Sequence, residues 1–215
     1  TRLKLGVNGR FMSANHAILD GEVTVSCPYR AAIGAGADAV VHVLESFVCN
    51  NSNSMTRAFA CQAMAYLYDS LSSLKSDPGN LTDRLNQLIG AHLAAISLFN
   101  SGSGIAGGLS YPLGVHYKVP HGLGGAMFCL DVVEYNIDKG YYEYATLAKS
   151  IGYNNPNEKK ASLELLLSLK KLFKYLGIPQ KLTELGLNSS DRDNLLTECQ
   201  SLQNAFDQNP VPFTV

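Results

Sequence analysis

The chain has 215 residues, of which 46% are hydrophobic and 16% are charged, and its formal net charge at pH 7 is -1. This length is sufficient for one large domain or two small domains with a substantial buried core. Because the net charge is close to zero, we expect neither nucleic acid nor an anionic membrane surface as a partner.

The cysteines and the first residues indicate the compartment. The five cysteines are scattered and form no Cys-x-x-Cys pair, a pattern typical of reduced thiols rather than of a disulfide framework. The opening run TRLKLGV lacks the apolar core of a signal peptide. We therefore predict a cytoplasmic protein.

One long stretch, from Leu85 to Tyr117, contains no Asp, Glu, Lys or Arg. Its continuously apolar part, LIGAHLAAISLF, is shorter than the about 20 residues that cross a bilayer, and NSGSG follows it directly. We expect a buried core helix here and no membrane as a partner.

Residues 1–25 differ from the rest of the chain. Leu3, Leu5 and Val7 alternate with polar or small residues, and AILDGEVTV is a second run that favours β-structure. Two or three short strands are only marginally stable alone, and no later segment supplies a sheet. We interpret residues 1–25 as the strand remnant of a domain that is mostly absent from this chain.

From residue 26 onward the apolar periodicity is helical, which predicts an all-α domain over residues 26–215. In the clearest helix, Asn155 is placed to cap the N-terminus, Pro156 takes the first position and Gly177 ends the helix. We expect a bundle of seven to nine helices. The expected helical segments are 29–48, 55–75, 82–99, a short piece through LSYPLG, about 120–136, 140–152, 156–176 and about 190–206.

Three residues form a candidate metal site. Asp38 and His42 in GADAVVHVLES are four residues apart, so a helix projects both side chains from one face, and His121 in YKVPHGLGG offers a third donor. One carboxylate with two imidazoles suits Fe(II) or Zn(II) better than Ca(II) or Mg(II). The spacing alone leaves open the alternative of a hydrogen-bonded polar pair in a helical core.

Three runs carry a resemblance that extends from about residue 3 to residue 215: GADAVVHVLESFV, LFNSGSGIAGGLSYPLGVHYKVPHGLGGAM and YLGIPQKLTELGL. In order and separation they resemble the C-terminal helical domain of iron-containing alcohol dehydrogenases. The N-terminal run resembles the last strands of that family's nucleotide-binding domain. The resemblance implies a helical bundle of the dehydroquinate synthase-like type, an NAD(P)-binding domain mostly missing here, and a metal in the cleft between the two domains.

The resemblance also implies roles for individual residues. It places the family's metal ligands on Asp38, His42 and His121. A further ligand histidine of the family is replaced by Gly107, and a histidine that many members hold near the substrate is replaced by Tyr111. Tyr111 is the candidate catalytic residue, expected either to donate a hydrogen bond to the substrate or to pack beside Pro112. We expect the metal shell to be completed by water or another residue unless the site is degenerate.

The implied activity is oxidoreduction of a small-molecule alcohol or aldehyde by metal-assisted hydride transfer. Fe(II) or Zn(II) and NAD(P) are the implied cofactors, with NAD(P) bound mainly by the missing domain, so we expect the isolated chain to be inactive and to form homo-oligomers through its exposed interdomain surface. The alternative is a metal-free, non-catalytic helical module of the same fold, which Gly107 favours. A lyase of the dehydroquinate synthase type ranks lower because it would carry Glu at position 38.

Other candidate residues have more than one interpretation. His116 is either a replacement ligand or a surface histidine, and His92 on an apolar helix is expected in the core. Glu45, one turn after His42, is either a hydrogen-bond partner of an imidazole or an exposed helix charge. The glycines of GSGIAGG match no phosphate-binding motif, so we expect them to mark close approach of the backbone.

Overall fold

The structure, a computed structural model, describes residues 9–199 and 202–213, and within these residues nine α-helices and four short 3-10 turns are present. The prediction of an all-α bundle with seven to nine helices is confirmed. The helices are α1 (Tyr29–Val48), α2 (Ser54–Ser73), α3 (Leu81–Ser101), α4 (Ile105–Tyr117), α5 (His121–Asp138), α6 (Tyr144–Ser150), α7 (Glu158–Leu176), α8 (Arg192–Cys199) and α9 (Gln203–Phe206). The 3-10 turns are η1 (Arg10–Met12), η2 (Glu22–Thr24), η3 (Leu182–Leu185) and η4 (Ser189–Asp191).

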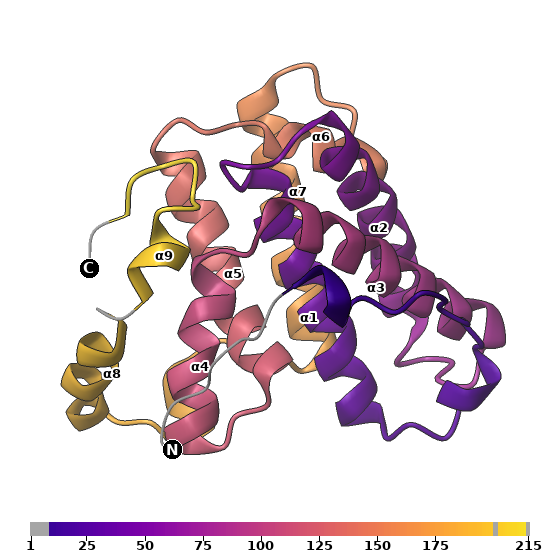
Figure 1. The fold of residues 1–215 in the computed structure, drawn as a ribbon, viewed down its shortest axis with the longest axis horizontal. Helices are drawn as coiled ribbons and strands as arrows, with labels where there is room; N and C mark the ends of the chain where they lie inside the picture. Colours follow the sequence, from indigo (N-terminus) through magenta and orange to yellow (C-terminus); the bar gives the residue numbers. More distant parts are fainter. Residues whose placement is uncertain (1–8, 200–201, 214–215) are drawn as a thin grey trace.

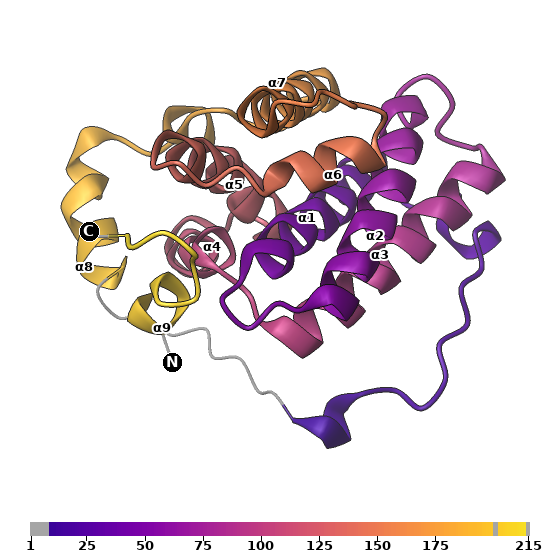
Figure 2. The same cartoon turned by 90° about the horizontal axis from the view of Figure 1, so that it is seen from above.

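Helix α1 is the centre of the bundle. It packs against α2 and α3 on one side and against α4 and α5 on the other, while α6 and α7 lie side by side over α2 and α5 (Figures 1 and 2). Its residues are mostly small or β-branched, and most of the apolar ones between Ala32 and Val48 are buried. A helix that is apolar on nearly all sides is stable in water only when other helices enclose it, which is the position of α1.

By length and composition, α1 is the only single helix in the described part of the chain that is able to cross a membrane, and 72% of its most apolar window is buried inside the protein. Helices α3 and α4 pass the same test only as a pair, and they are bent by 105° relative to each other. The break between them is the glycine-rich segment 102–104, in which Gly102 has a φ of 119° that favours glycine. The charge-free stretch therefore forms two helices of the bundle.

The prediction of strands before residue 26 is wrong for the residues that the structure describes. No strand occurs in residues 9–199 or 202–213, and the run AILDGEVTV contains the 3-10 turn η2 instead. Val23 and Val25 in this run are exposed, and no neighbouring strand is present to complete the hydrogen bonds of a sheet. The other expected strand, at Leu3, Leu5 and Val7, lies outside the described residues.

The helix ends follow the sequence signals with one shift. Helix α7 begins two residues later than expected, because Asn157 rather than Asn155 caps it by accepting a hydrogen bond from the backbone N–H of Lys160 (2.9 Å). Gly177 ends α7 with a φ of 78°, as predicted. The single helix expected over 190–206 is described as α8 and α9, on either side of residues 200–201.

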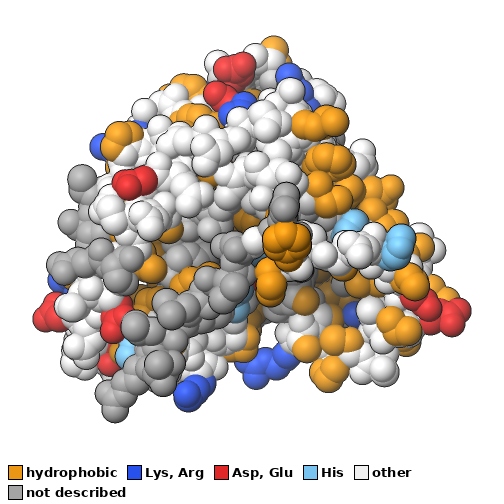
Figure 3. Space-filling view, viewed as in Figure 1, with side chains coloured by type: hydrophobic (Ala, Val, Ile, Leu, Met, Phe, Trp, Pro, Cys, Tyr) orange, Lys and Arg blue, Asp and Glu red, His pale blue; other side chains and the backbone are white. Residues whose placement is uncertain are grey.

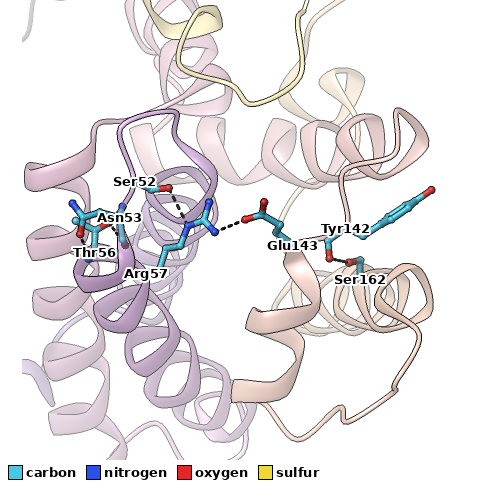
Figure 4. Close-up of polar contacts among 7 residues, drawn as sticks. All are labelled: Ser52, Asn53, Thr56, Arg57, Tyr142, Glu143 and Ser162. Atoms are coloured by element: carbon cyan, nitrogen blue, oxygen red, sulfur yellow. Dashed lines mark hydrogen bonds and ion pairs between the residues drawn. The ribbon is translucent and has the colours of Figure 1, made fainter.

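Polar contacts join the start of α2 to the loop before α6 (Figure 4). Arg57 donates through Nε to Ser52 Oγ (3.1 Å) and through Nη1 to Glu143 Oε2. Ser162 on α7 donates to the backbone carbonyl of Tyr142 (2.8 Å). These bonds hold α2, α6 and α7 together at the end of the bundle opposite the N-terminal half of α1.

Glycines allow the helices around α1 to approach it closely. A Cβ on Gly122 of α5 would lie 2.1 Å from the carbonyl oxygen of Gly34 and 2.8 Å from Asp38 Cβ, distances that real Cβ atoms do not adopt. A Cβ on Gly36 would likewise lie 2.5 Å from Leu71 Cδ2 of α2. The first of these crossings places the first turn of α5 directly against the middle of α1.

Candidate metal centre

Helix α1 presents Asp38 and His42 from one face, as their spacing predicts. His42 Nε2 lies 3.7 Å from Asp38 Oδ2, and both side chains are 26% exposed. The two groups are therefore accessible from solvent while their neighbours Val40, Val41 and Val43 are buried. This arrangement forms one wall of a site that a ligand from solvent can reach.

His121 is the first residue of α5 and completes the cluster. Its Nε2 atom lies 3.8 Å from Asp38 Oδ1, and one donor atom from each of Asp38, His42 and His121 lies within 4.8 Å of the other two. Two donor atoms that bind one ion tetrahedrally at about 2.1 Å each lie about 3.4 Å apart, so a bound ion requires the donor atoms of the cluster to move together by up to about 1.4 Å. The three residues fit a divalent transition metal, and they are the only such group within residues 9–199 and 202–213.

A serine orients the ring of His121. Ser110 Oγ lies 2.5 Å from His121 Nδ1 and 2.6 Å from the carbonyl oxygen of Gly107. Because the hydroxyl has one proton, which it donates to the Gly107 carbonyl, its oxygen accepts from the Nδ1–H of His121. The lone pair of His121 is then on Nε2, the atom that faces Asp38, which is the tautomer that a metal ligand needs.

Burial keeps His42 ready to bind a metal. Desolvation lowers the pKa of His42 below its ordinary value, and the nearby Asp38 carboxylate opposes this shift only in part. The imidazole is therefore neutral near pH 7. A neutral imidazole does not have to lose a proton before it coordinates an ion.

A cleft of about 460 Å³ opens beside the cluster. Tyr111 lines it with its ring tilted by 33° against the ring of His121, at a centroid distance of 5.5 Å. Gly9, from the N-terminal segment, also lines it. Exposed apolar side chains gather on the face of the molecule seen in Figure 3. Phe11 and Met12, which follow Gly9, are exposed, as is Phe99 of α3, which lines the cleft.

Glu45 lies at the inner wall of the same cleft, and neither interpretation made from the sequence applies to it. Its side chain is only 6% exposed, and its Oε1 atom accepts a hydrogen bond from the backbone N–H of Gly107 (2.8 Å) rather than from an imidazole. Burial raises the pKa of Glu45 to about 7, although the nearby backbone of Gly107, Gly104 and Ala106 favours the ionised form. The glycines of GSGIAGG therefore mark a close approach of the backbone, and the group that Gly104 and Gly107 approach is the Glu45 carboxyl group.

The remaining histidines lie outside the cluster. His116 Nε2 is 3.4 Å from Glu198 Oε1, so it pairs with α8 instead of replacing a metal ligand. His92 is exposed on α3, and its expected place in the core is wrong, because the buried side of α3 that packs on α1 and α2 is formed by other residues such as Ala94 and Ser97. Lys118 is the exposed C-cap of α4 with a φ of 59°.

The chain matches the Fe-containing alcohol dehydrogenase family, C-terminal, over residues 32–215 and belongs to this family. It is 26% identical to long-chain-alcohol dehydrogenase 1 of Geobacillus thermodenitrificans over 94% of this chain and 52% of that protein. It is also 26% identical to the 1,3-propanediol dehydrogenase of Klebsiella pneumoniae, over 90% and 50% of the two chains. A solved structure of an alcohol dehydrogenase from Oenococcus oeni superposes with a TM-score of 0.82 at 26% identity, over 89% of this chain and 50% of that one. The chain thus spans about half the length of the relatives it matches.

The close crossing of α1 and α5 predicts that metal affinity depends on a residue that offers no ligand. Gly122→Ala should weaken Zn(II) binding by at least about tenfold and destabilise the protein by about 1–3 kcal/mol, because the new Cβ separates His121 from Asp38. Calorimetric titration and chemical denaturation measure both effects. Gly114→Ala is the matched control, since a Cβ there meets only the Val119 carbonyl at 3.5 Å; an unchanged affinity in Gly122→Ala would contradict the account.

The raised pKa of Glu45 predicts how stability changes with pH in the metal-free protein. A carboxyl whose pKa is higher in the folded than in the unfolded state favours folding while it is protonated, so this contribution is complete below about pH 4.5 and is lost as the pH rises to about 7. The loss amounts to about 3 kcal/mol. Glu45→Gln should remove this slope and be more stable than the wild type at pH 8, as measured by urea unfolding at a series of pH values. A slope identical in both proteins would be inconsistent with a buried, titrating Glu45.

Proposed function

We propose that residues 26–215 are the metal-binding half of an NAD(P)-dependent alcohol dehydrogenase that interconverts a small-molecule alcohol and its aldehyde or ketone. The observation that carries this proposal is the convergence of Asp38, His42 and His121 on one point at the mouth of a cleft. Membership of the iron-containing alcohol dehydrogenase family supports it. In this proposal residues 1–25 connect to a nucleotide-binding domain.

The residues of this chain would hold the metal ion, orient one of its ligands and offset its positive charge. Asp38, His42 and His121 would hold Fe(II) or Zn(II), which when bound supplies a Lewis acid for the substrate oxygen, while NAD(P) carries the hydride and is bound mainly by the nucleotide-binding domain. Ser110 fixes the direction of the His121 lone pair. The Asp38 carboxylate supplies the negative charge that offsets the cation beside the otherwise apolar middle of α1.

Tyr111 is the proposed substrate-binding residue. It lines the cleft, and its ring lies beside the ring of His121. Its hydroxyl would donate a hydrogen bond to the substrate oxygen and so favour the oxygen's negative charge while hydride leaves or arrives. We further propose that the protein acts in the cytoplasm and assembles as a homo-oligomer through the exposed apolar face around Phe11 and Phe99.

A second candidate function is a metal-free helical module without catalytic activity. The observation in its favour is Gly107, which offers no side chain at the position of a family ligand. Metal binding distinguishes the two candidates directly, because the module would not respond to an added ion.

The first test is thermal unfolding of the chain with and without Zn(II) or, without oxygen, Fe(II). An ion at about 100 times its dissociation constant should add about 2.7 kcal/mol of stability and raise Tm by about 5–10 °C. His42→Ala and His121→Ala should lose this increase, whereas His92→Ala, an exposed histidine outside the cluster, should keep it. A Tm that does not change with either ion would favour the metal-free module.

The second test concerns NAD(P). Because we place nucleotide binding mainly in another domain, calorimetric titration of these 215 residues with NAD or NADP should give no binding in the micromolar range. Micromolar binding by the isolated chain would show that this division of roles is wrong.

A further inference from the structure

We propose that Glu45 is the fourth protein ligand of the metal centre, coordinating through Oε2 in the space that glycine at position 107 leaves open. The inference deepens the proposed function and rests on it. Of the two expected ways to complete the shell, water or another residue, it selects a residue and gives a site of two carboxylates and two imidazoles.

The position of Glu45 on α1 supports this role. Asp38, His42 and Glu45 are separated by four and three residues, so their side chains leave the helix within about 60° of one another. The Glu-x-x-His pairs of two-metal sites in helical bundles show that a carboxylate and an imidazole three residues apart on one helix are able to reach the same metal centre, although the order here is His42 and then Glu45. Helix α1 would then supply three ligands and α5 the fourth.

The burial of Glu45 supplies the second observation. Its Oε2 atom is buried and has no hydrogen-bond partner among the described residues, although Oε1 is held by the N–H of Gly107. A buried carboxylate oxygen without a partner is costly, so a group that satisfies it is expected. Glu45 lines the metal cleft together with His42 and His121, and a cation in that cleft would provide this group.

Gly107 makes the space for this coordination. A Cβ at position 107 would lie 3.0 Å from Glu45 Oε2, closer than its 3.7 Å distance to the other carboxyl oxygen. The unpartnered oxygen therefore faces the volume that a side chain at 107 would fill. In the structure the group within 4.8 Å consists of Asp38, His42 and His121, so Glu45 closes the shell by rotating its carboxylate toward that group.

Metal affinity tests the proposal without measuring activity. Co(II) and Zn(II) affinities are measured by competition with a chromophoric chelator at one pH, and the visible spectrum of the Co(II) protein reports changes in coordination. Glu45→Gln should weaken both affinities by about 10- to 100-fold and change the Co(II) spectrum. Its amide oxygen still accepts from the Gly107 N–H, so the fold should be retained. Glu134→Gln is the charge-matched control, since Glu134 pairs with Lys170 on the surface, and it should leave both readouts unchanged.

A second variant tests the same coordination position from the other side. Gly107→His should restore the affinity of Glu45→Gln to within about threefold of the wild type, because the imidazole takes the vacated position. In the wild-type background the same substitution should leave affinity unchanged or lower it, since Glu45 already occupies the position. The measurement in the wild-type background does not depend on whether Glu45→Gln folds.

Three results would overturn the inference: unchanged affinity in Glu45→Gln, an unchanged Co(II) spectrum in that variant, or a tenfold gain from Gly107→His alone. The first of these would leave a structural water as the partner of Oε2. If His42→Ala also leaves affinity unchanged, the proposed metal function itself fails, so the two failures are distinguishable.

Discussion

The close contact between α1 and α5 at Gly34 and Gly122 is the constraint on which the candidate site depends. His121 begins α5 and cannot reach Asp38 unless the two helix backbones nearly touch, and any side chain at Gly122 would prevent this. The enclosure of α1 by its neighbours then fixes the direction in which Asp38 and His42 point. The cluster of Asp38, His42 and His121 is thus a consequence of helix packing and needs no loop to assemble it.

The groups at the inner wall of the cleft depend in turn on the start of α4. Glu45 brings a carboxyl group into a helix whose other residues are mostly apolar, and the start of α4 stabilises it through the Gly107 N–H. The carbonyl oxygen of Gly107 accepts a hydrogen bond from the Ser110 hydroxyl, and the Ser110 oxygen in turn accepts one from His121 Nδ1–H. One short segment of α4 therefore orients groups from both α1 and α5, and its small residues are required for the backbone to come this close.

The sequence was sufficient to predict the all-α class and the positions of the long helices, because the apolar periodicity of a helix marks the face that it buries. The meeting of Asp38, His42 and His121 was predicted from the four-residue spacing of the first two and from the family resemblance. It did not predict the state of the N-terminal segment, since strand propensity at AILDGEVTV forms no strand without a partner. The burial of Glu45 also escaped prediction, although the glycines at 104 and 107 were a signal that the backbone there approaches something closely. Ser110 carried no signal, because its role depends on the angle between α4 and α5.

The most direct test of the central claim is a crystal structure of the Zn(II)-loaded chain, with anomalous diffraction recorded at the zinc absorption edge. The account predicts one strong anomalous peak at about 2.0–2.2 Å from Asp38, His42 Nε2 and His121 Nε2. A strongest peak elsewhere on the protein, or an ion that leaves these three side chains without contact to it, would contradict the account.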